Sequence, residues 1–229
     1  MRASSGMPDD LAYRIWMNGL RHTASALLHG AYRLRIEGRE NVPREGPALV
    51  LSNHVAFHDF LFAGIAMGRP VRFVMHQHHF RYPALRAFFH ACRVIPIAPA
   101  KQDPARLAEA MEAIDAALAR GELVVMFPEG RMSEDGSLSE IRPGLERIVA
   151  YRPVPVIPVV VDGLFGSWMS RAHGEPMSTP PRRFRAPVTI RVGAPIPPER
   201  ASAAIVRARM EALLRAPAPP TAEASASVA

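Results

Sequence analysis

The chain has 229 residues, 48% of them apolar and 21% charged, which are the proportions of one ordinary globular domain and not of a disordered chain. No run of 18 or more apolar residues occurs, so we expect no transmembrane helix, and residues 1–10 lack the apolar segment of a secretory signal. The single cysteine, Cys92, excludes an internal disulfide and a cysteine-based zinc site, and an intracellular chain is the expected default.

The charge balance favours an anionic partner. Lysine and arginine total 28 against 21 acidic residues, a net charge of +7, and Lys101 is the only lysine. Such an excess suits a nucleic acid, a membrane surface or a phosphorylated substrate. A GC-rich coding sequence, which favours arginine, alanine and proline, explains the same composition equally well.

Residues 10–32 are predicted to form an amphipathic helix. Apolar side chains recur at spacings of three, four and one along this segment, which places them on one stripe. Such a helix packs on its own domain, or it also touches lipid, with Trp16 and the arginines at the level of the headgroups. The stripe consists of Tyr13, Trp16, Met17, Leu20, Ala24, Leu27, Leu28 and Ala31.

Downstream of residue 32, short apolar segments typical of β-strands alternate with segments that have a helical pattern. The clearest helix is 104–120, with Asp103 as its N-cap, Pro104 at its first position and Gly121 as its stop. Strands are expected at Leu34–Glu37, Ala48–Ser52, Val71–Met75, Val94–Ile97, Leu123–Phe127, Val154–Val161 and Val188–Val192.

This alternation predicts an α/β fold, with a mostly parallel central sheet of about seven strands flanked by helices. We expect a single domain over residues 10–215, which includes the N-terminal helical segment 10–32. Residues 216–229 consist of Ala, Pro, Ser and Thr with one acid and one valine, and we expect a disordered tail there. In such folds ligands bind beyond the carboxyl ends of the strands, so the residues that follow each strand matter most.

His54 and Asp59 follow the run Ala48–Ser52 at the spacing H-x-x-x-x-D. An imidazole just past a buried strand, with a carboxylate one helical turn later, can act as a general base held by its orienting partner. The alternative is that Asp59 caps a helix starting near Phe60 and that His54 is an ordinary loop residue.

A second polar segment, Phe127-Pro128-Glu129-Gly130-Arg131, follows the run Leu123–Phe127. Proline ends the strand, glycine permits a tight backbone, and an arginine at a strand end suits a phosphate. A surface turn with an ion pair is the alternative. Lys101 follows the run Val94–Ile97, so three strand ends can deliver polar side chains to one edge of the sheet.

Taken together, these segments resemble the phospholipid/glycerol acyltransferase family, whose best-known members acylate lysophosphatidic acid. The blocks that carry the resemblance occur in order between about Leu34 and Ile196. They are Asn53-His54…Asp59, Phe127-Pro128-Glu129-Gly130-Arg131 and Val154-Pro155-Val156-Ile157-Pro158-Val159.

The resemblance implies an O-acyltransferase without a metal or cofactor, with acyl-CoA or acyl-carrier protein as donor and a lysophospholipid as acceptor. It implies a peripheral position on the cytoplasmic face of the membrane. His54 would be the general base and Asp59 its orienting partner, while Glu129, Gly130 and Arg131 would belong to the block that binds the acceptor phosphate.

Three positions depart from the family pattern. Ala56 stands where a serine is frequent, and His58 directly precedes Asp59, so the choice of base needs the structure. Another family block, at the run Val94–Ile97, usually ends its strand with an Asp-Arg pair that contacts phosphate. Here Ile97 is followed by Ala98-Pro99, and we assign the charge of that pair to Arg93 or Lys101. The sequence around Gly136 and Gly163 is similar to that of the subgroup that reacylates lysophospholipids such as lysophosphatidylethanolamine. Reacylation of such a lysophospholipid is one alternative function, and non-catalytic binding of anionic lipid is the other.

Two rival sites were weighed. His76, His78 and His79 could bind a metal with His90, but no nearby cysteine or carboxylate completes the set. Arg182, Arg183, Phe184 and Arg185 form a basic patch with one aromatic ring, but it lacks the pattern of a nucleic-acid-binding surface, so we expect no nucleic acid partner. Cys92 precedes an apolar strand and is expected to be a buried, inert thiol.

Overall fold

The computed structural model describes residues 7–178, 180 and 185–217. Its helices are α1 (Met7–Ala31), α2 (Asp59–Ala66), α3 (Pro83–Ala91), α4 (Pro104–Ala119), α5 (Gly144–Tyr151) and α6 (Ala203–Arg215), with short 3-10 helices at Arg39–Asn41, Gln77–Arg81 and Pro198–Arg200. Its strands are β1 (Tyr32–Glu37), β2 (Ala48–Ser52), β3 (Val71–His76), β4 (Ile95–Ile97), β5 (Leu123–Met126), β6 (Val156–Asp162) and β7 (Ala186–Val192).

The seven strands form one mixed, mostly parallel sheet in the order β1-β7-β6-β2-β5-β3-β4. Every neighbouring pair is parallel except β6 and β7, which run antiparallel. The strands from β6 to β4 therefore end at the same edge of the sheet, called the carboxyl edge below. The opposite edge, where these strands begin, is called the amino edge.

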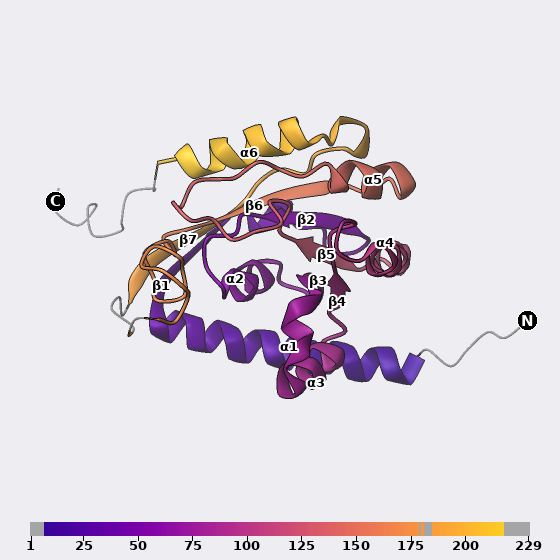
Figure 1. Ribbon diagram of the computed structural model, residues 1–229, viewed down its shortest axis with the longest axis horizontal. Helices are drawn as coiled ribbons and strands as arrows, with labels where there is room; N and C mark the ends of the chain where they lie inside the picture. Colours follow the sequence, from indigo (N-terminus) through magenta and orange to yellow (C-terminus); the bar gives the residue numbers. More distant parts are fainter. Residues whose placement is uncertain (1–6, 179, 181–184, 218–229) are drawn as a thin grey trace, which may run out of the picture.

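Helices cover both faces of the sheet (Figure 1). α1, α2 and α3 lie on one face, and α4, α5 and α6 lie on the other. The central strand β2 is buried along its whole length, with Ala48 and Val50 facing the first layer and Leu49 and Leu51 facing the second. Two covered faces explain why this strand is an uninterrupted apolar run.

The expected elements are confirmed with small shifts of boundary. All seven strands and the helix at 104–120 are present, and Asp103 caps α4 by accepting a hydrogen bond from the Arg106 N–H at 2.9 Å. α1 begins at Met7, earlier than expected, with Pro8 in its first turn, where a missing N–H costs nothing. Tyr32 opens β1, paired with Ala186, and does not end the helix.

Only part of the predicted stripe of α1 is buried. Met17 and Leu28 are buried in the core, and Tyr13, Leu20 and Ala24 pack against it. Large apolar side chains of α1 and of the segment that holds α3 are exposed, and these two helices lie on the same face of the sheet (Figure 1). The exposed residues are Leu11, Ile15, Trp16, Leu27, Tyr82, Leu85 and Phe88. No helix of the described residues is long and apolar enough to cross a membrane. Of the predicted tail, residues 218–229 lie outside the described part of the chain.

Candidate active site

The site begins where β2 ends, at Asn53. This asparagine is buried and clamps the strand end to β6: its Nδ2 donates to the Val161 carbonyl at 3.1 Å, and its Oδ1 accepts from the Val161 N–H at 2.7 Å. The Asn53 side chain thus takes over the hydrogen bonding between β2 and β6 for one more residue, after the backbone of β2 has turned away from the sheet. It fixes the point from which the next residue, His54, projects at the carboxyl edge.

Asp59 pairs with His54. The carboxylate is fully buried at the first residue of α2, and its Oδ2 lies 3.0 Å from His54 Nδ1. The same oxygen accepts hydrogen bonds from the backbone N–H groups of Val55 and Ala56, at 2.6 and 2.8 Å. These donors precede the helix, so Asp59 holds the loop that carries the histidine and is not used as a helix cap.

His54 is fixed on every side but one. Its backbone N–H donates to Glu129 Oε1 at 2.8 Å, its carbonyl accepts from the Ser133 N–H at 2.7 Å, and its ring stacks on Phe127 with centroids 4.4 Å apart. Within the described chain, Nε2 is the polar atom of His54 without a partner. The side chain is 21% exposed, so this nitrogen is open to a substrate. An oriented imidazole with one free nitrogen is what a general base requires.

Glu129 supports this arrangement from the next strand end. It is buried, and its Oε2 accepts from the Ser139 N–H at 2.7 Å while Oε1 holds the His54 backbone. Burial raises the pKa of the Glu129 carboxyl, against the opposing effect of these hydrogen bonds. The carboxylate therefore contacts the backbone that positions the base, a role that motif spacing alone did not reveal.

Gly130 makes the turn that brings Glu129 inward. Its φ of 67° lies in the left-handed region, and a Cβ there would meet the Arg142 guanidinium at 2.6 Å. Arg142 in turn donates to the Glu129 carbonyl at 3.1 Å, which holds the turn from its other side. Any residue but glycine would strain this loop.

Arg131 and Lys101 both lie at the carboxyl edge with exposed side chains. Arg131 follows the Gly130 turn, next to the strand end that holds His54. Lys101 follows β4, three strands away from β2 in the sheet, which is about 14 Å at the usual strand spacing. Among the described residues neither has a hydrogen bond or ion pair, so both remain available to an anion.

Arg93 lies elsewhere. It precedes β4, so it belongs to the amino edge, and its guanidinium lies over the Tyr13 ring at 4.2 Å while its carbonyl accepts from Arg72. The structure does not bring Arg93 together with His54, because the length of the sheet separates them. Of the two cations proposed to replace the missing pair, only Lys101 lies at the carboxyl edge.

His58 is not a competing base. Its ring is buried and turned inward, with Nε2 2.9 Å from Tyr32 Oη and the ring edge against Phe62. Burial lowers the pKa of His58, against the opposing charge of Asp59. His54, in contact with the carboxylate and open to solvent, is therefore the histidine that the geometry equips for proton transfer.

His76 is the last residue of β3, and His78 and His79 follow it in the 3-10 helix Gln77–Arg81. His79 lies edge-on against Phe57, with centroids 5.6 Å apart, and burial lowers its pKa, with nearby His78, His76, His54 and Arg81 acting in the same direction. His76 is held between the His78 N–H and Gln102. No group of three potential metal ligands occurs among the residues that the structure describes.

Two further sequence interpretations concern Cys92 and the basic patch at residues 182–185. Cys92 is buried, and burial raises the pKa of its thiol, as expected of an inert side chain. Residues 181–184 of the basic patch, with Arg182, Arg183 and Phe184, lie outside the described residues. Sequence reasoning missed Phe127 as a stacking partner and Ser133 as a backbone donor to His54.

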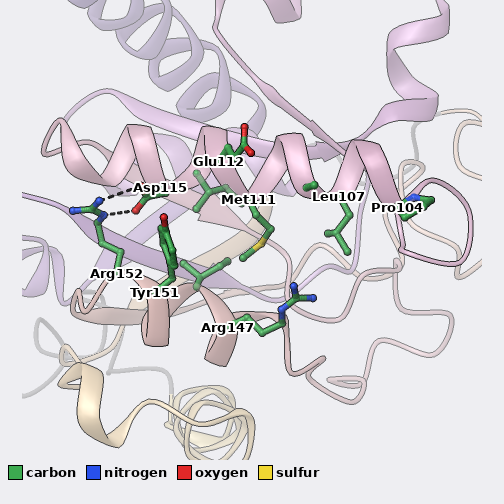
Figure 2. Close-up of a pocket in the computed structure, with 11 residues that line it drawn as sticks. Pro104, Leu107, Met111, Glu112, Asp115, Arg147, Tyr151 and Arg152 are labelled. Atoms are coloured by element: carbon green, nitrogen blue, oxygen red, sulfur yellow. Dashed lines mark hydrogen bonds and ion pairs between the residues drawn. The ribbon is translucent and has the colours of Figure 1, made fainter.

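Two hollows lie away from His54. A groove of about 510 Å³ separates α4 from α5, and the Asp115–Arg152 ion pair closes one end of it (Figure 2). An apolar hollow of about 80 Å³ lies between α1, α2, α3 and β3, lined by Met17, Leu20, Phe73 and Phe88 among others. Neither includes a residue that the sequence assigned to the site.

Comparisons with known proteins find similarity to acyltransferases. A family model described as Acyltransferase matches residues 33–162, more than half of the chain. The chloroplastic 1-acyl-sn-glycerol-3-phosphate acyltransferase of Arabidopsis thaliana is 29% identical over 61% of this chain and 39% of its own length. A 1-acyl-sn-glycerol-3-phosphate acyltransferase of Chlamydomonas reinhardtii is 26% identical over 58% of this chain and 39% of its own length. The aligned part therefore spans about two fifths of these relatives.

The fold also has a solved counterpart. The crystal structure of the 1-acyl-sn-glycerophosphate (LPA) acyltransferase PlsC from Thermotoga maritima superposes with a TM-score of 0.70, covering 95% of this chain and 86% of that one. The two sequences are 18% identical, so this likeness concerns the fold.

Proposed function

This chain belongs to the acyltransferase family, and from that premise we propose that it moves a fatty acyl group from a thioester to the free glycerol hydroxyl of a lysophospholipid. The donor is acyl-CoA or acyl-carrier protein. The acceptor that its relatives' names favour is 1-acyl-sn-glycerol 3-phosphate. The observation that carries the proposal is the His54–Asp59 pair, whose one free nitrogen faces outward at the carboxyl edge of the sheet.

The reaction is a direct transfer in two bond changes. His54 Nε2 takes the proton of the acceptor hydroxyl as its oxygen attacks the thioester carbonyl, and Asp59 stabilises the positive charge on the imidazole. The tetrahedral intermediate then expels the thiolate, which receives the proton back from His54. Products are the diacyl lipid and the free thiol, so no other reactant is required.

The cations at the carboxyl edge suit the acceptor phosphate. Arg131 and Lys101 are exposed there, without protein partners in the described part of the chain. Guanidinium and ammonium groups bind phosphate by charge-assisted hydrogen bonds. Glu129 and Gly130 support this block by shaping the turn that presents Arg131.

A peripheral position on a membrane, at its cytoplasmic face, completes the proposal. Leu11, Ile15 and Trp16 of α1 are exposed, as are Leu85 and Phe88 of α3, and the two helices lie on the same face of the sheet (Figure 1). Helices with such apolar faces and flanking arginines lie in the interface plane of a bilayer. The apolar hollow between these helices could take part of an acyl chain directly from that surface.

One departure favours a second acceptor. Ala98-Pro99 follow β4, where the family resemblance leads us to expect a charged pair, so the phosphate has fewer fixed partners than in the resembling enzymes. Reacylation of another lysophospholipid, such as lysophosphatidylethanolamine, needs less charge at this point. A non-catalytic lipid-binding protein would not need the His54–Asp59 pair.

Thiol release from a long-chain acyl-CoA tests the proposal. Purified protein is assayed with a panel of lysophospholipids that includes lysophosphatidate and lysophosphatidylethanolamine, with an acyl-carrier protein thioester in a parallel arm and His54→Ala as control. We expect acceptor-dependent release that His54→Ala abolishes, and the best acceptor names the head group. No release with either donor and any acceptor would contradict the function.

A further inference from the structure

Two buried polar atoms on adjacent residues of the site have no partner. They are Nδ1 of His58 and Oδ1 of Asp59, and both are shielded from solvent. An unpaired buried polar group destabilises the folded protein, so two such atoms on residues next to the base require an explanation. The other carboxylate oxygen, Oδ2, accepts three hydrogen bonds, from His54, Val55 and Ala56.

The protonation of His58 decides whether these two atoms can satisfy each other. Burial lowers its pKa, so the ring is neutral and carries one N–H, on Nε2 or on Nδ1. Burial also raises the pKa of Tyr32, so its phenol keeps the proton and can donate it. Tyr32 Oη lies 2.9 Å from His58 Nε2, and that contact can run in either direction.

Only one direction of the Tyr32–His58 hydrogen bond makes His58 Nδ1 a donor that could pair with the acceptor Asp59 Oδ1. If Nε2 carried the proton, His58 Nδ1 would be a lone-pair acceptor, as Asp59 Oδ1 is, so neither atom could satisfy the other. If Tyr32 donates to Nε2, then Nδ1 carries the proton and becomes a donor to the carboxylate. The Tyr32 and Phe62 rings pack against the imidazole and hold it in place.

We propose that His58, oriented by Tyr32, is a positioning residue for the acyl transfer: its Nδ1–H holds Oδ1 of Asp59, directly after a small rotation or through one water molecule. The carboxylate is then held at both oxygens, so it cannot rotate away from His54. The hydrogen-bonded chain runs from β1 through His58 and Asp59 to the base. This inference rests on the proposed function only where activity is the readout.

The tautomer of His58 tests it without any activity. Nitrogen-15 NMR of histidine-labelled protein distinguishes Nδ1–H from Nε2–H, and we expect Nδ1–H at neutral pH in wild type. Finding Nε2–H would overturn the proposal, whether or not the protein releases thiol.

A pair of variants then separates positioning from packing. In His58→Asn the side-chain nitrogen occupies the place of Nδ1 and can still donate to Asp59, whereas in His58→Gln it reaches the place of Nε2. We expect His58→Gln to lose roughly tenfold in kcat, the effect of one hydrogen bond to a charged group, with KM unchanged, and His58→Asn to retain most of kcat. Glutamine fills more of the imidazole's space, so a purely structural role predicts a higher kcat for His58→Gln than for His58→Asn. That order of activities would overturn the proposal.

Tyr32→Phe is the second arm, because it keeps the ring packing and removes only the hydroxyl. We expect this variant to melt near wild type and to show a mixed His58 tautomer with a severalfold lower kcat. An unchanged tautomer in Tyr32→Phe would contradict the orienting role of Tyr32.

Discussion

The two edges of the sheet each carry a buried network of charged side chains, but the networks serve different purposes. At the carboxyl edge, Asp59 and Glu129 hold His54 by its ring and its backbone and leave Nε2 open. At the amino edge, Arg72 forms a two-pronged ion pair with Glu122, at 2.6 and 3.0 Å, and donates to the Arg93 carbonyl. There the cations also cover the ring of Tyr13, which fastens α1 to the sheet.

The difference shows that a buried charge is not by itself a sign of a reactive site. Each network gives its buried charged side chains hydrogen-bond partners, but only the carboxyl edge keeps one reactive atom facing solvent. Substitutions at the carboxyl edge should therefore reduce turnover, and substitutions at the amino edge should reduce stability.

Asp59→Asn carries the largest expected effect. The amide oxygen takes the place of Oδ2, because the Val55 and Ala56 N–H groups donate there, so His54 keeps its orientation but loses the negative charge that stabilises its protonated form, and we expect kcat to fall by roughly 10²–10⁴-fold. Initial rates of thiol release measure it. Asp115→Asn, on α4 away from His54, should stay close to wild type. An Asp59→Asn enzyme with wild-type activity would contradict the claim that the carboxyl edge serves turnover and the amino edge serves stability.

Glu129→Gln should reduce both turnover and stability. Its amide offers one acceptor to the two N–H groups of His54 and Ser139, so one donor faces another donor. We expect a loss of about 1–3 kcal/mol in the free energy of unfolding, and a lower kcat as the His54 backbone shifts. Urea denaturation and thiol release measure the two effects. A fully active and more stable variant would show that Glu129 does not position the base.

Lys101→Ala and Arg131→Ala should affect acceptor binding more than chemistry. Each removes an exposed cation at the carboxyl edge, so we expect KM for an anionic acceptor to rise roughly tenfold with little change in kcat. Arg209→Ala, an exposed arginine on α6, is the matched control. If the KM for lysophosphatidate stays constant in both variants, the phosphate binds elsewhere.

The smallest expected effect concerns the amino edge and pH. Burial alone would raise the pKa of Glu122, but the hydrogen bonds from Arg72 and Arg120 outweigh it and lower that pKa. The stability it contributes is present above the ordinary carboxyl pKa and is lost as pH falls through the lowered value. The stability gap between wild type and Glu122→Gln should therefore narrow in acid. A gap that is constant with pH would indicate that the ion pair contributes nothing.

Much of this arrangement could be predicted because it depends on local sequence. The buried strand Ala48–Ser52 appears as an uninterrupted apolar run, and His54 and Asp59 follow it within one turn of chain. The rule that ligands bind beyond strand ends placed them at the carboxyl edge. The same rule could have excluded Arg93, because that residue precedes its strand.

The rest depends on contacts between distant parts of the chain. Glu129 reaches the His54 backbone across 75 positions, and Tyr32 reaches His58 across 26. No spacing in the sequence indicates which way either side chain turns. The outward face of α1 was equally hidden, because the periodicity that placed Trp16 and Met17 on one stripe could not show that only Met17 is buried.

The most direct test of the account is acceptor-dependent thiol release by wild type and His54→Ala, beside thermal melts of both proteins. His173→Ala, which changes an exposed loop histidine, is the matched control. The account predicts that His54→Ala loses at least about a hundredfold in rate while it melts with wild type, because Asp59 keeps its two backbone donors. A folded His54→Ala protein that turns over at the wild-type rate would contradict it.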